Sequence, residues 1–129
     1  VEVRQRGRWI GDTRRRAGEL QLRSWLRTGL SGERVDTAAT GWGADEILTF
    51  DRDGETSVVW TLRMDSSEDA DELAAAAADL ETTLESRNAT AVETARVGDE
   101  TVVVFAGPES FVADATASGT DGAVTVTVP

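Results

Sequence analysis

The stretch GWGADEILTF, residues 41–50, decides how this chain is expected to fold. Two glycines flank a tryptophan, two carboxylates follow, and an apolar run then begins. Glycine allows backbone conformations and close approaches that other residues resist, so Gly41 and Gly43 indicate a sharp junction. The apolar run at 47–50 predicts a strand directly after them. The stretch therefore predicts the point where a helix ends and a sheet begins.

Two helices are predicted before this junction. Apolar side chains and glycines recur at helical spacing on one face between residues 18 and 29, and Asp12 or Thr13 can serve as the N-cap. A second, shorter helix is expected at 31–40. Residues 1–11 carry many charges and indicate either an extended segment or a loose arm.

Two strands and a long helix are predicted after the junction. The segment DRDGE at 51–55 is typical of a hairpin turn, because its glycine supplies the positive φ that such turns need. Apolar and polar residues alternate at 57–64, which predicts a strand buried on one face. Residues 65–86 predict the clearest helix, with a stripe of alanine and leucine and an acidic start.

The last third of the chain predicts a second strand pair, weak at 89–96 and strongly apolar at 101–106. Pro108 is expected to start a short helix. The segment at 116–122 is expected to be a loop, and 118–129 as a whole predicts an edge strand or a linker.

The order α-α-β-β-α-β-β-α, with a final strand as an option, predicts the fold class. Strands joined by tight turns are antiparallel, and helices then cover one face of their sheet. We therefore expect one α+β domain over residues 1–129, in two layers, with an antiparallel sheet of about four strands covered by helices.

Four residue types are missing from the chain: His, Cys, Tyr and Lys. Their absence removes disulfides, thiol nucleophiles, the usual general base, the usual zinc ligands and Schiff-base chemistry. Catalysis would have to use carboxylates, hydroxyls and arginine, and paired carboxylates are the one familiar route. We therefore expect a domain that is not an enzyme and holds no cofactor.

The net charge of −11 comes from 13 arginines against 24 acidic residues. An acidic surface with arginine as its only base is typical of proteins adapted to high salt, where screening relieves self-repulsion. An acidic protein from a GC-rich genome is the alternative. The acidity also argues against nucleic acid as a partner.

The charge is unevenly distributed along the chain. Residues 1–34 hold nine arginines and four acidic residues, a net charge of +5. The remainder holds four arginines and twenty acidic residues, a net charge of −16. The basic segment is expected to lie against the acidic remainder of the chain, or against an acidic neighbour.

The turn at 51–55 carries a candidate metal site. Asp51, Asp53 and Glu55 resemble the first half of a calcium loop. The bidentate glutamate of such a loop would fall at position 62, which is leucine, and strands rather than helices flank the turn. A hairpin turn is the main prediction, and calcium is the alternative.

The junction carries candidate acid–base residues as well. Asp45 and Glu46 could form an acid–base pair with Glu19 or Asp12. Neighbouring residues on a strand point to opposite faces, however, so Asp45 and Glu46 do not face each other. We therefore expect Asp45 to be structural and to bind an arginine of the first helix. Trp42 is expected to cover the junction, and a ligand platform is the alternative role for its ring.

Two features concern the setting of the protein. The triplet NAT at 88–90 makes Asn88 a candidate N-glycosylation acceptor, which would place the domain outside the cell. No segment is long and apolar enough to cross a bilayer, and the acidic face of the helix at 65–86 argues against membrane insertion. Because the chain starts at Val1, we expect a mature or excised piece of a longer protein.

A longer pattern resembles a theme of secreted bacterial and haloarchaeal surface proteins. The stretches that carry it are GELQLRSWLR at 18–27, AATGWGADEILTF at 38–50 and VVWTLRMDSSEDADELAAAAADL at 58–80. The theme runs GE-x-x-L-R-x-W-L, then GWGGD, then W-D-S-x-x-D-A. Here Ala44 replaces a glycine and Met64 replaces a tryptophan. The resemblance implies an extracellular domain and brings no catalytic residues.

Together these observations define the expected site and function. The structural junction is expected to comprise Glu19, Gly41, Trp42, Gly43 and Asp45. The expected function is a non-catalytic extracellular or cell-surface domain of a salt-adapted protein, packing on a neighbouring domain of its own chain or on surface proteins. The alternatives are an accessory or regulatory domain of a secreted hydrolase and a carbohydrate- or calcium-binding module.

Overall fold

The fold is taken from a computed structural model that describes residues 1–87 and 90–129. The helices are α1 (Glu19–Leu26), α2 (Gly32–Ala39), α3 (Ser67–Ser86) and α4 (Glu109–Asp114). One sheet contains, in spatial order, β2 (Ile10–Arg15), β3 (Trp42–Arg52), β4 (Glu55–Met64), β6 (Thr101–Gly107) and β5 (Ala91–Val97). The other contains β1 (Glu2–Gln5), β8 (Ala123–Val128) and β7 (Thr116–Thr120).

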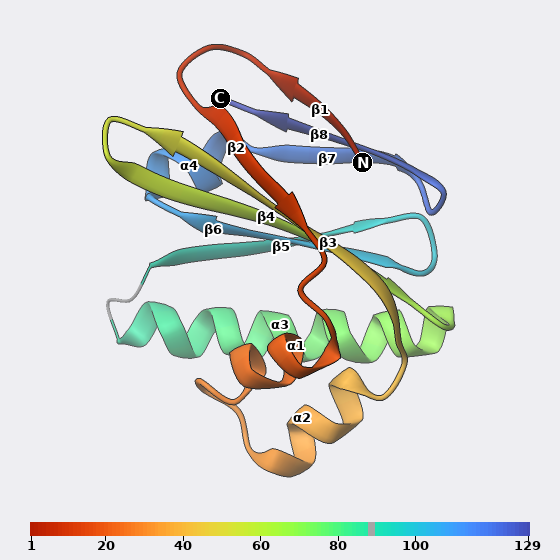
Figure 1. The fold of residues 1–129 in the computed structure, drawn as a ribbon. Helices are drawn as coiled ribbons and strands as arrows, with labels where there is room; N and C mark the ends of the chain where they lie inside the picture. Colours follow the sequence, from red (N-terminus) through yellow and green to blue (C-terminus); the bar gives the residue numbers. More distant parts are fainter. Residues whose placement is uncertain (88–89) are drawn as a thin grey trace.

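The elements form three layers (Figure 1). Helices α1, α2 and α3 lie on one face of the antiparallel five-stranded sheet, and the three-stranded sheet lies over its other face. Side chains alternate along each strand, so the central sheet contributes to two separate cores. The near-continuous apolar run of β6 is explained by this burial on both faces.

The first core lies between the helices and the central sheet. From α3, small and branched side chains face the sheet at helical spacing and are fully buried, among them Ala70, Leu73 and Leu80. Alanine keeps this long helix close to the strands, where Trp60 and Leu62 of β4 complete the packing. This core binds the helix layer to one face of the central sheet.

The second core overturns the predicted fold class. A two-layer domain with one sheet of about four strands is wrong, because eight strands in two sheets occur within residues 1–87 and 90–129. The second core lies between the sheets and includes Trp9, Phe105, Phe111 and Val126. The outer face of the central sheet is therefore covered by strands and by α4.

The N-terminal arm is part of this second core and is not loose. Strand β1 pairs in parallel with β8, and Trp9 is only 1% exposed. The Trp9 ring meets Phe111 of α4 edge-on, with 5.0 Å between ring centroids. Because β8 pairs with β1 on one side and β7 on the other, the segment expected as an edge strand or linker is the central strand of its sheet.

The segment 116–122, expected as a loop, contains β7. Its residues are small and polar and show no apolar alternation, so its strand geometry comes from pairing with β8 rather than from its own pattern. Strand β2 was not predicted because all six of its residues are exposed, so its sequence shows no apolar alternation.

The hairpin at 51–55 has the geometry that its sequence indicates. Strands β3 and β4 remain paired up to Arg52 and Glu55, and Asp53 and Gly54 both have positive φ, 49° and 84°. Two positive φ values in a two-residue turn match the twist of a hairpin. Strand β3 itself starts at Trp42 rather than Ile47, with a bulge between Trp42 and Ala44.

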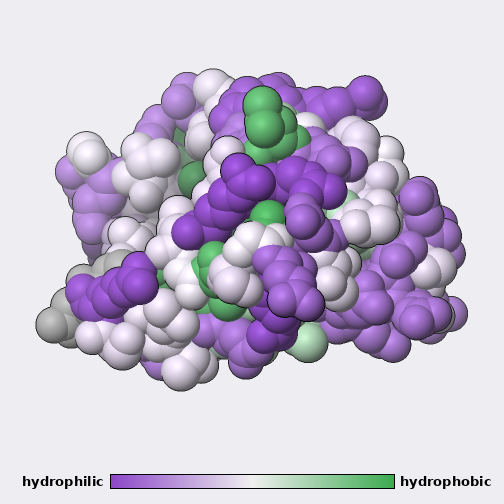
Figure 2. Space-filling view, turned by 90° about the horizontal axis from the view of Figure 1, so that it is seen from below, coloured by the Kyte–Doolittle hydropathy of each residue, from purple (hydrophilic) through white to green (hydrophobic). Residues whose placement is uncertain are grey.

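The outer face of the helix layer is mostly hydrophilic (Figure 2). Hydrophobic side chains appear there only in separate, limited areas. In the ranges 1–87 and 90–129, no helix combines the length and the apolar character that a membrane span requires.

Candidate functional site

The helix–sheet junction is organised by one carboxylate. Asp45, near the start of β3, accepts hydrogen bonds from the backbone N–H groups of Ala17 and Gly18, at 2.8 and 2.9 Å. Its Oδ2 also accepts from the Trp60 indole Nε1 of β4, at 2.8 Å. Because Gly18 is the N-cap of α1 and offers no side chain, Asp45 satisfies donors at the helix start from outside the helix.

The predicted arginine partner of Asp45 is wrong. Arg23, the arginine of α1, does not contact Asp45. It pairs with Glu19 at 2.9 Å and with Asp36 of α2 at 2.7 Å. The carboxylate of Asp45 lies at the start of α1, where the helix dipole favours a negative charge. The backbone N–H groups there bind it in place of an arginine. Glu19 therefore supports α1 through Arg23 and does not meet Asp45 directly.

The two glycines of the GWG motif make room for the start of α3. A Cβ atom at Gly41 would overlap the side chain of Asp69, and one at Gly43 would lie 3.0 Å from Asp65 Oδ1. The Gly41 carbonyl accepts a hydrogen bond from the Asp65 N–H at 2.7 Å. Close approach of chain segments thus favours glycine strongly at Gly41 and makes the fit tight at Gly43.

Trp42 lies between these glycines and packs partly buried against the first core. Its indole Nε1 is buried and has no hydrogen-bond partner within residues 1–87 and 90–129. The neighbouring ring pair is formed by Trp25 of α1 and Trp60, edge-on at 6.0 Å between centroids. Trp42 therefore contributes to the core between the helices and the central sheet.

The carboxylates of the 51–55 turn do not converge. Asp51 accepts a hydrogen bond from the Thr56 hydroxyl at 2.9 Å, and Asp53 lies near Arg52. Asp12 of β2 lies beside Asp51, and the hydrogen bond and charge of Asp51 raise the pKa of Asp12. Among the described parts of the chain, no group of three or more acidic side chains is placed to hold a metal ion.

Asn88, the candidate glycosylation acceptor, lies outside the described residues.

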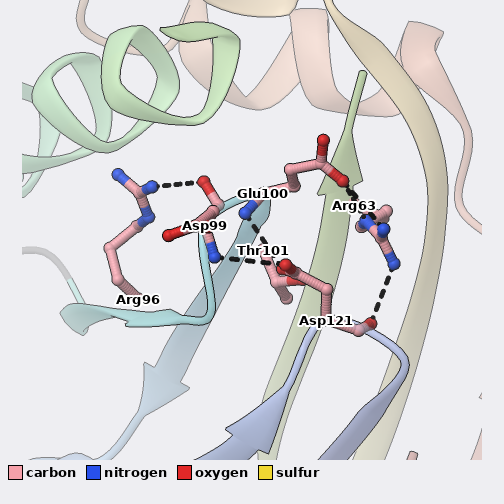
Figure 3. Close-up of polar contacts among 6 residues, drawn as sticks. All are labelled: Arg63, Arg96, Asp99, Glu100, Thr101 and Asp121. Carbon is pink, nitrogen blue, oxygen red and sulfur yellow. Dashed lines mark hydrogen bonds and ion pairs between the residues drawn. The ribbon is translucent and has the colours of Figure 1, made fainter. Parts of the chain in front are cut away.

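A second polar cluster joins the two sheets, and the sequence did not indicate it. Asp121, in the β7–β8 turn, inserts its carboxylate into the β5–β6 turn (Figure 3). It accepts hydrogen bonds from the N–H groups of Asp99 and Glu100 and from the Thr101 hydroxyl, at 3.2, 2.9 and 2.8 Å. The backbone donor of Glu100 and the Thr101 hydroxyl, aided by the Asp99 N–H and the charge of Arg63, hold the pKa of Asp121 below its usual value.

Two arginines complete this inter-sheet cluster. Arg63 of β4 donates from Nε and Nη2 to Glu100 Oε1, at 3.1 and 2.8 Å, and from Nη1 to the Asp121 carbonyl at 3.0 Å. Arg96 of β5 donates to the Asp99 carbonyl and pairs with Asp71 of α3 at 2.6 Å. One network therefore links the helix layer, the central sheet and the outer sheet.

The inter-sheet cluster borders a hollow of about 200 Å³ between the sheets. Glu46, Thr61, Arg63 and Asp121 contribute polar groups to its lining. Arg63 and Asp121 belong to the inter-sheet cluster, and the Thr61 hydroxyl donates to the Glu46 carbonyl at 3.2 Å. Glu46 Oε1 lies 3.1 Å from Arg14 Nη1, but it is buried and accepts no hydrogen bond within the described residues. The polar groups of this hollow hold the layers together.

The sequence carried only a weak signal for this cluster. Asp99 and Asp121 each lie in a segment that is typical of an ordinary turn, and about twenty residues separate them along the chain. Only Gly98 offers a hint, because it has a φ of 68° and a Cβ there would meet the Asp121 carboxylate.

A third feature is an arginine-rich surface at the start of the chain, which we name the arginine edge. It comprises Arg6, Arg8, Arg15 and Arg16, on and beside β2 at one edge of the central sheet. All four are exposed, and none forms an ion pair within residues 1–87 and 90–129. The basic segment at 1–34 was predicted to lie against the acidic remainder of the chain. Arg14 and Arg34 do pair with acidic residues of that remainder, Glu46 and Asp79.

The fold and these clusters define a mostly β, three-layer domain whose polar networks join its layers. The chain belongs to the family described as Domain of unknown function (DUF8575), whose profile matches residues 6–128. Searches of curated proteins and of solved structures gave no match.

Proposed function

We propose that this chain is a non-catalytic, extracellular domain of a salt-adapted protein, and that it packs on an acidic neighbouring surface through its arginine edge. One observation carries the proposal: four exposed arginines, on and beside the edge strand β2, form no ion pair within residues 1–87 and 90–129, on a molecule with a net charge of −11. Exposed guanidinium groups form strong bidentate contacts with carboxylates, and charge complementarity selects partners.

The absence of a catalytic role is supported by the engagement of the polar groups. The chain has no His, Cys, Lys or Tyr. The carboxylate of Asp45 accepts three hydrogen bonds that tie α1 to the sheet. An acid–base pair needs two carboxyl groups with separate roles facing one substrate, and Asp45 and Glu46 point to opposite faces of β3.

Binding to a model acidic surface tests the proposal. Poly-L-glutamate labelled with a fluorophore should bind the domain at low salt, with an affinity that falls as salt is raised. The variant R8E/R15E should bind at least about tenfold more weakly, because it reverses two charges of the arginine edge. The variant R27E/R87E changes the net charge equally at other exposed arginines and should bind nearly as well as the unmodified domain. Equal loss in both variants, or no binding by the unmodified domain, would contradict the proposal.

A further inference from the structure

The opposite edge of the central sheet carries a surface of complementary character. A hollow of about 390 Å³ lies between α3, β5 and α4. Four glutamates surround it: Glu81, Glu85, Glu93 and Glu109. Buried Val92 and Val112 lie among its lining residues and give it an apolar floor. We name this surface the glutamate hollow.

The carboxylates of the glutamate hollow have no cation to balance them. None of the four forms an ion pair within the residues that the structure describes. Partial burial of Glu81, together with the charges of Glu93 and Glu85, raises the pKa of Glu81. Burial is the larger cause, and the charges of Glu93 and Glu85 add a repulsion that a bound cation would relieve.

The arginine edge has the matching properties. Its four guanidinium groups form no ion pair within the described residues, and Ile10 of β2, with 65% of its surface exposed, lines a hollow with Arg8, Arg52 and the carboxylates Asp12, Asp51 and Asp53. An exposed isoleucine beside arginines fits an apolar floor surrounded by glutamates. The two surfaces therefore agree in charge and in the placement of apolar groups.

We propose that the arginine edge of one copy of this chain docks in the glutamate hollow of a second copy. The inference rests on the proposed function, that the arginine edge binds an acidic surface, and it identifies that surface. A second copy of this chain carries both surfaces. One contact between two copies therefore neutralises the arginines of one molecule and the glutamates of the next.

The positions of the two surfaces determine the kind of assembly. The arginine edge lies at β2 and the glutamate hollow at β5, and these are the two edge strands of the central sheet. A contact between different surfaces is head-to-tail, so it leaves one free surface of each kind and continues into a chain of copies. Association should therefore produce a series of species rather than a closed dimer.

Sedimentation velocity tests the assembly. The unmodified domain at low salt should give a weight-average sedimentation coefficient that increases with protein concentration. The variants R8E/R15E and E85R/E93R should each sediment as monomers, because each lacks one of the two surfaces. All four substituted side chains are exposed, so the fold should be retained; circular dichroism checks this.

Mixing the two variants gives the decisive result. R8E/R15E keeps the glutamate hollow, and E85R/E93R keeps the arginine edge, so an equimolar mixture should associate although neither variant associates alone. The control R27E changes an exposed arginine that belongs to neither surface, and it should assemble like the unmodified domain. A monomeric unmodified domain, or a mixture of variants that stays monomeric, overturns the inference. If the unmodified domain stays monomeric but still binds poly-L-glutamate through the arginine edge, the proposed function survives without this inference.

Discussion

Asp45 accepts three hydrogen bonds where the sequence predicted an ion pair with an arginine. Sequence reasoning assigned it a structural role at the helix–sheet junction and gave it an arginine partner. The structure instead places two backbone N–H groups and the Trp60 indole around its carboxylate. Backbone donors are present at every helix start and leave no mark in the sequence, so their choice over an arginine could not be read from residue types.

The substitution Asp45→Asn should lower the free energy of unfolding by about 2 kcal/mol. The amide keeps the size of the side chain, but it presents an NH₂ group to N–H donors and loses the negative charge at the start of α1. Urea denaturation in high salt measures the change. Trp60→Phe removes the indole donor and also shrinks a buried ring, so its cost includes a cavity contribution. An unchanged midpoint for Asp45→Asn would show that the three hydrogen bonds do not stabilise the junction.

Asp121 should make stability depend on pH in the acidic range. Its pKa is lowered in the folded protein by the Glu100 N–H and the Thr101 hydroxyl. Its contribution is therefore present above the unfolded-state pKa of about 4 and is lost as pH falls through the lower folded-state pKa. Asp121→Asn should lower the urea midpoint at pH 7 and reduce its decline on acidification. Equal pH profiles for both proteins would contradict this role.

Elements with strong local sequence patterns were predictable, and elements whose geometry depends on pairing with distant strands were not. The long helix at 65–86 and the apolar strand at 101–106 carry strong local patterns, and α3 and β6 lie at or close to those positions. Strands β1, β2 and β7 carry charged, exposed or small polar residues, and their geometry depends on partners distant in the sequence. The inter-sheet cluster was missed with them, because it exists only where the two sheets meet.

Trp9 should be the main anchor of the N-terminal arm. Its ring is buried between α4 and the sheets, and the guanidinium of Arg52 lies 5.9 Å from the ring centroid. Trp9→Ala should cost about 3–5 kcal/mol, from lost burial and from the cavity that remains. Thermal or urea denaturation measures the loss. A cost below about 1 kcal/mol would mean that the arm can leave without disturbing the second core.

At the scale of the whole molecule, the proposed salt adaptation predicts a response to ionic strength. The midpoint of thermal unfolding should rise between dilute buffer and ~1 M KCl, because a Debye length of ~3 Å at that concentration screens the repulsion among the acidic side chains. Sorbitol, which is excluded from protein surfaces without screening charge, is the control. A flat or falling midpoint in KCl would contradict salt adaptation. Self-association should weaken over the same range, so the midpoint is also measured with R8E/R15E, which should not assemble.

The parallel pairing of β1 with β8 has a mechanical consequence. The first and last strands of the chain lie side by side, and the two chain ends lie at opposite ends of that pair (Figure 1). A force that pulls the ends apart therefore slides the strands along each other and loads all their hydrogen bonds at once. Opening the pair from one end would break the same bonds in succession, at lower force. A domain tethered at both ends would thus resist stretching along the direction in which it is held.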